Sequence, residues 1–153
     1  MGRLVMIKCD CGYEYDRYSY GANSSYPEVR KHQTALAKPG KYGKYWKELL
    51  TSDSELKVNA RLKIYQCPNC HKIYDEFCLD LYKTKHDDRY FYTPTEEETL
   101  YHYKHICPEC KKKMELIPLS EKEYKDFFNQ KEEFVICPKC GNIAIVKFCG
   151  HTF

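Results

Sequence analysis

A small metal-stabilised α+β fold is predicted by three features of the sequence. Eight of the ten cysteines in the 153-residue chain form four close pairs. Segments with the apolar pattern of short strands flank these pairs, and a stretch with helical periodicity separates the first pair from the second. We therefore predict two zinc ribbons, which are β-hairpins with a metal ion at their turns, and a helical insertion in the N-terminal ribbon.

The four cysteine pairs have the spacing of metal ligands. Three have the sequence Cys-Pro-x-Cys and the first is Cys-Asp-Cys-Gly. A tight turn of this form aims two sulfurs at one ion, so a tetrahedral site needs two turns. Four pairs predict two closed sites, each with one Zn²⁺ as the expected cofactor. The pairs are Cys9 with Cys11, Cys67 with Cys70, Cys107 with Cys110, and Cys137 with Cys140.

The C-terminal ribbon is predicted over residues 99–153. Strand patterns lead into and out of its two pairs at 105–106, 113–117, 133–136 and 142–148. Between the two hairpins, Ser120 and Glu123 form a capping box that predicts a short helix. We assign the second metal site to this ribbon, with Cys107, Cys110, Cys137 and Cys140 as its ligands.

The N-terminal ribbon is predicted over residues 1–83, with its helical insert at about 25–58. Pro27 suits the first turn of one helix, whose inner face would carry Val29, either His32 or Gln33, and Leu36. A second helix would bury Trp46 on an apolar stripe with Tyr42, Leu49 and Leu50.

Strands at 62–66 and 73–82 complete the N-terminal ribbon, and residues 84–98 follow as a linker or a docked loop. The first metal site then consists of Cys9, Cys11, Cys67 and Cys70. The alternative joins Cys67 and Cys70 to Cys107 and Cys110, which leaves the first pair for the last. We favour the first arrangement because closing longer loops costs more entropy.

The sequence also predicts a cytoplasmic protein without a membrane span. No signal-like or 18-residue apolar segment is present, and clustered cysteines in a reducing compartment are typical of metal ligands. Eight bound thiolates and two Zn²⁺ would change the formal charge from +3 to about −1. Bulk charge therefore gives no support for nucleic-acid binding.

Two resemblances follow from these motifs. The segments 9–16 and 136–141 resemble the two metal-binding loops of rubredoxins, in which four cysteines hold one iron for electron transfer. The first loop departs from rubredoxins by having one residue, not two, between its cysteines. The whole arrangement resembles small uncharacterised bacterial zinc-ribbon proteins, which implies a metal-binding fold without an assigned activity.

The function predicted from these observations is a non-enzymatic binding module for a protein or a single-stranded nucleic acid. Candidate nucleic-acid contacts are basic residues interleaved with aromatic ones: Lys41, Lys44, Lys47 and Arg89. Iron electron transfer is an alternative, and thiol-disulfide exchange at a Cys-x-x-Cys pair is a weaker one. Cys78, Cys149 and His151 remain outside the two predicted sites.

Overall fold

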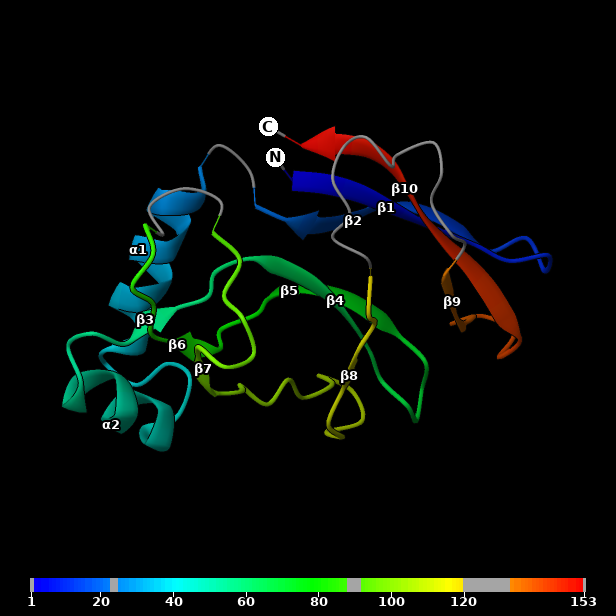
Figure 1. The fold of residues 1–153 in the computed structure, drawn as a ribbon. Helices are drawn as coiled ribbons and strands as arrows, with labels where there is room; N and C mark the ends of the chain where they lie inside the picture. The colour runs from blue at the N-terminus through cyan, green and yellow to red at the C-terminus, as the bar shows by residue number, and fades with distance from the viewer. Residues whose placement is uncertain (1, 23–24, 88–91, 120–132, 153) are drawn as a thin grey trace.

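The computed structural model describes residues 2–22, 25–87, 92–119 and 133–152. Two helices lie at one end of the molecule, and a larger curled sheet forms the other end (Figure 1). The larger sheet has the order β5-β4-β2-β1-β10-β9, with β8 also paired to β4, and the smaller sheet has the order β3-β6-β7. The elements are β1 Gly2–Lys8, β2 Glu14–Gly21, α1 Tyr26–Ala37, α2 Lys44–Ser52, β3 Lys57–Val58, β4 Leu62–Gln66, β5 Ile73–Phe77, β6 Leu81–Tyr82, β7 Thr99–Tyr101, β8 Glu115–Leu116, β9 Glu133–Ile136 and β10 Ile143–Thr152.

The first and last strands of the chain lie side by side in the larger sheet (Figure 1). β1 and β10 are antiparallel, and Val5 lies opposite Phe148 while Ile7 lies opposite Val146. Val5, Ile7 and Val146 are all buried, because alternate residues of each strand face the same core. This long-range pairing fixes the turn after β1 beside the turn that joins β9 to β10.

The larger sheet curls into a half-barrel. Its corner is the single residue pair that joins β2 to β4, between Gly21 and Leu62, and Gly21 has a φ of 88° that a glycine adopts without strain. The inner face carries the main apolar core. Its most buried members are Val5, Ile7, Ile64, Cys137, Ala144 and Val146.

Both predicted helices are present inside the predicted insertion. α1 has Pro27 in its first turn, as expected, and of the two alternatives at its inner face Gln33 is the buried one and His32 is exposed. Trp46 on α2 is 1% exposed and packs in a second core with Leu50 and residues of the smaller sheet. The prediction that Trp46 is a core residue is confirmed.

The predicted strand 73–82 is broken into two strands. Leu79 has a φ of 61° and separates β5 from β6.

His102, which follows β7, lies between two carboxylates. Its ring is 2.7 Å from Glu96 and 2.9 Å from Asp80. Glu96 and then Asp80 raise the pKa of His102, because each stabilises the imidazolium form.

The division into two ribbons at residues 84–98 needs correction. Strands from the predicted N-terminal part (β1, β2, β4, β5) and from the predicted C-terminal part (β8, β9, β10) belong to one sheet. Within the described residues of 84–98 the two ends of the segment contact each other, since Lys83 N–H donates to Glu98 C=O and Thr84 Oγ1 to the Tyr92 hydroxyl. The helix predicted from Ser120 lies outside the described residues.

Candidate metal centres

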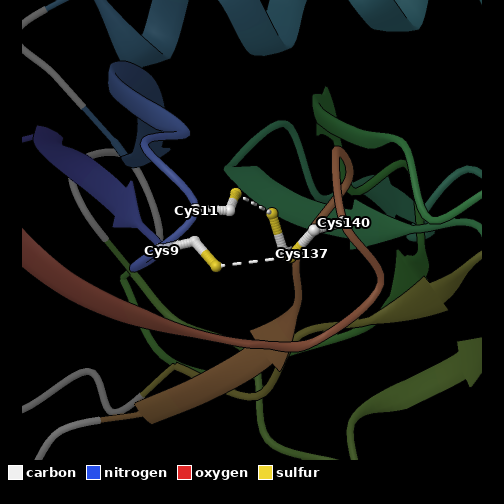
Figure 2. A group of neighbouring side chains, drawn as sticks. All are labelled: Cys9, Cys11, Cys137 and Cys140. Carbon is white, nitrogen blue, oxygen red and sulfur yellow. Dashed lines mark hydrogen bonds between the residues drawn. The ribbon is translucent and has the colours of Figure 1, made fainter.

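Centre A consists of Cys9, Cys11, Cys137 and Cys140, whose four sulfurs lie within 4.8 Å of one another. Figure 2 shows the side chains converging from the turn after β1 and the turn between β9 and β10. The sulfur of Cys9 is 3.6 Å from that of Cys140, and the sulfur of Cys11 is 3.7 Å from that of Cys137. Four sulfurs arranged around zinc in a tetrahedron, each about 2.3 Å from the ion, would lie about 3.8 Å apart. The spacing therefore suits one tetrahedral ion.

Centre B consists of Cys67, Cys70, Cys107 and Cys110, which also lie within 4.8 Å of one another. The sulfurs of Cys70 and Cys107 are 3.8 Å apart. The first pair lies in the turn between β4 and β5, and the second lies in the turn before β8. Two separate groups of four cysteines are thus present, as the four pairs predicted.

The predicted pairing of the turns, however, is wrong. Cys9 and Cys11 join the last pair rather than the second, so the alternative arrangement is the observed one. Loop closure does not decide the pairing, because doubling the length of a loop adds only about 0.6 kcal/mol to its closure cost. The pairing of β1 with β10 extends over seven residue pairs and outweighs that small term.

The four turns share one hydrogen-bond pattern. In the three Cys-Pro-x-Cys turns, the first cysteine receives a hydrogen bond at its carbonyl from the residue four positions later, over 2.9 to 3.0 Å. That residue has a positive φ each time: 64° at His71, 58° at Lys111 and 77° at Gly141. The first turn is one residue shorter, and there Gly12 donates to Cys9 with a φ of 98°. Only two of the four positions are glycine, so glycine alone is an incomplete signal for this turn.

Hydrogen bonds from amides to sulfur favour thiolates in both centres. The backbone N–H of Cys110 points at the Cys107 sulfur, 3.5 Å away, and lowers the Cys107 pKa to about 7 against the effect of burial. Burial opposes ionisation of Cys137, but the amides of Cys140 and Lys139 outweigh it and lower its pKa to about 7. Cys107 in centre B and Cys137 in centre A are therefore ionised more readily than a free thiol. A divalent cation would bind cysteines as thiolates.

Each centre has an inner and an outer pair of ligands. Cys67, Cys107 and Cys137 are fully buried, and Cys9 is nearly so. The outer ligands differ: Cys11 and Cys140 of centre A are exposed, whereas Cys70 and Cys110 of centre B are half-buried. Asn69 adds a side-chain hydrogen bond to the Cys110 sulfur over 3.2 Å. Centre A is thus the more accessible of the two.

Gln66 connects the two centres, a role that nothing in the sequence indicated apart from its position just before Cys67. Its side-chain amide donates to the carbonyl of Ile136, over 2.6 Å, and to that of His71, over 2.9 Å. Its side-chain oxygen accepts from Ile136 N–H at 3.4 Å. Because Ile136 precedes Cys137, this one side chain links a ligand strand of centre B to a ligand strand of centre A.

The remaining candidates lie outside both centres. Cys78 is buried, Cys149 is exposed, and neither belongs to a cluster of metal-ligating groups among the described residues. Lys41 and Lys44 are exposed and Lys47 is half-buried on or just before α2, with Lys44 3.9 Å from Glu48. Arg89 and the side chain of His151 lie outside the part of the chain that is described.

Comparisons with known proteins add no assignment. Neither models of protein families, nor curated proteins, nor solved structures give a match to this chain. Within the described residues, no helix has the length and apolar character needed to cross a membrane. The functional reading therefore depends on the geometry of the two centres.

Proposed function

We propose that this protein is a zinc-binding module in which two structural Zn²⁺ ions hold a rigid surface for a macromolecular partner. The observation that carries the proposal is the presence of two groups of four cysteines whose sulfurs lie within 4.8 Å of one another, with the nearest cross-turn pairs 3.6 to 3.8 Å apart. Four thiolates fill a tetrahedral coordination sphere, so no position stays open for a substrate or a water nucleophile. This ligand set favours a structural role over hydrolysis.

The positions of the centres also support a structural role. Centre A holds together the turns at the ends of β1 and β9, and centre B holds β4 close to the segment that leads into β8. β8 is only two residues long and β4 meets β2 through a single residue pair. Such short pairings contribute little stability alone, so metal ions would supply much of it.

Elemental analysis tests the metal assignment. The protein is purified without added metal and its zinc and iron are counted per chain, and Co²⁺ replacement then reports the ligands through the absorption of a tetrahedral thiolate site. Two zinc ions per chain, with loss of cooperative melting after chelation, support the proposal. A compact protein whose melting does not change after complete metal removal would refute it.

A second candidate, one-electron transfer at iron in centre A, is supported by one specific contact. The segments that resemble the two rubredoxin loops carry Cys9, Cys11, Cys137 and Cys140, and these cysteines form a single group. Cys11 and Cys140 are exposed, which would give a redox partner access to the ligands. Iron in centre A would give a red ferric protein with one iron per chain and a reversible bleaching on reduction. A colourless protein with two zinc ions would exclude this function.

A further inference from the structure

Among the described strands, the half-barrel is open between β8 and β9, which do not pair with each other. β4 pairs with β8, and β9 pairs with β10, but within the described residues no strand pairs with the outer edge of β9. A groove of about 260 Å³ lies there. It is lined by both strands and their neighbours, including Leu116, Ile117, Phe134, Ile136 and Ile143.

The backbone groups on both sides of this groove have the directions of free strand edges. Cys137 N–H donates to Asn142 C=O, so the backbone N–H and C=O of residues 137 and 135 point at β10. The same groups of Phe134 point away from β10. On the other side of the groove, Ile117 N–H donates to Ile64 C=O, so the backbone groups of Ile117 point at β4 and those of Leu116 point away from it. An extended chain placed in the groove would find the N–H and C=O of Phe134 on one side and those of Leu116 on the other.

The side chains around these edges are apolar and unusually exposed. Leu116 is 47% exposed, Phe134 61% and Ile143 68%. Phe134 and Ile143 share a face as diagonal neighbours, because Phe134 lies opposite Ile145. Large apolar side chains gathered along an open strand edge mark a binding site for an added strand.

Gln66 limits the length of the open edge. Its side-chain amide already satisfies both the N–H and the C=O of Ile136, as a neighbouring strand would do. Within the described part of the chain, Phe134 is then the one residue of β9 whose outward N–H and C=O have no strand partner. The same side chain holds β4 at a fixed distance from β9, which keeps the groove from closing.

We propose that this groove binds an extended segment of a partner protein as an added β-strand, with apolar side chains at alternate positions. The inference rests on the proposed binding function and chooses protein over nucleic acid. Lining residues of the groove include no lysine or arginine among those described, and phosphates need such cations. A second copy that paired through its other edge strand, β5, would bring the carboxylates of Asp75 and Glu76 to this apolar groove.

The experiment uses the full-length metal-bound chain. A phage-displayed library of random hexapeptides is selected on it, and the enriched peptides are synthesised and titrated by fluorescence anisotropy. We expect enriched sequences with apolar residues at every second position, and loss of binding when their central amide is N-methylated. Phe134→Pro removes the outward N–H of β9 while sparing the bonds to β10, and Phe134→Val is the control that retains this N–H. We expect Phe134→Pro to bind about tenfold more weakly than Phe134→Val, because a backbone hydrogen bond is lost and the proline ring obstructs the edge.

The proposal would be overturned by no enrichment of any peptide, by equal binding of the two Phe134 variants, or by a Phe134 amide already protected from hydrogen exchange in the free monomer. The last result would mean that the chain fills its own groove. Concentration-dependent dimerisation that Phe134→Pro abolishes would instead identify a second copy as the occupant and refute a separate partner. The metal content of every sample is measured, so a chain without bound metal refutes the zinc-module function, whereas two zinc ions without peptide binding refute only this inference.

Discussion

Replacing Gln66 tests whether one side chain holds the two metal-binding halves together. Gln66→Met keeps the length of the side chain but removes its hydrogen bonds at 2.6, 2.9 and 3.4 Å. Two good bonds at about 1 kcal/mol each, and a weak third, predict a loss of about 2 kcal/mol in the free energy of unfolding. For a chain of this size the melting temperature should fall by roughly 4 to 8 °C.

The assay is urea and thermal unfolding with zinc in excess, so that metal occupancy is the same in all samples. Lys63→Met on the same strand is the matched control, because the Lys63 side chain makes no hydrogen bond or ion pair within the described residues, and it should stay within about 0.5 kcal/mol of the parent protein. Hydrogen exchange should also show faster exchange of the Ile136 amide in Gln66→Met. A variant as stable as the control, with the Ile136 amide still protected, would refute the bridging role.

Three further predictions concern the centres and the loops. The double variant Cys11→Ser with Cys137→Ser loses ligands of centre A alone and should keep one zinc ion, whereas Cys11→Ser with Cys67→Ser loses a ligand of each centre and should keep none. Native mass spectrometry counts the bound ions. The reverse result would restore the pairing favoured by the sequence. His102 has a raised pKa, so its stabilising contribution is complete below pH about 6.5 and disappears as pH rises through the raised pKa. Because the side chain is 56% exposed, His102→Gln should cost less than about 1 kcal/mol in melts at pH 5.5, and a cost that grows towards pH 8.5 would contradict the ion-pair explanation. Gly141 has a φ of 77°, and an added Cβ would meet nothing within 4 Å. Gly141→Ala should therefore lower the free energy of unfolding by about 1 to 2 kcal/mol through backbone strain alone. An unchanged urea midpoint would show that the turn relaxes.

Local chemistry was predictable from the sequence. The cysteine pairs predicted the turns and two groups of four sulfurs, because the ligands of each turn are adjacent in the chain. Pro27 and the stripe around Trp46 predicted both helices. β9 was also predicted with its observed bounds, since its apolar residues end directly at Cys137.

Long-range pairing was not predictable in the same way. Nothing in the segment from Gly2 to Lys8 specifies β10 as its neighbour, because Val5 and Ile7 would suit the inner face of any strand pair. The partners of Cys9 depend on that choice, so the error in strand pairing became an error in metal ligands. The role of Gln66 was hidden for the same reason, since its partner Ile136 is 70 residues away.

The nested order of the two centres has a consequence for protein synthesis. Centre B can close once Cys110 has left the ribosome, whereas Cys11 must wait for Cys137, 126 residues later. At about 5 to 20 residues per second, the first two thiols would stay without their partners for roughly 6 to 25 s. During that interval the nascent chain exposes reactive sulfur and an unpaired first strand, so the cellular supply of reductant and chaperones bears on its yield.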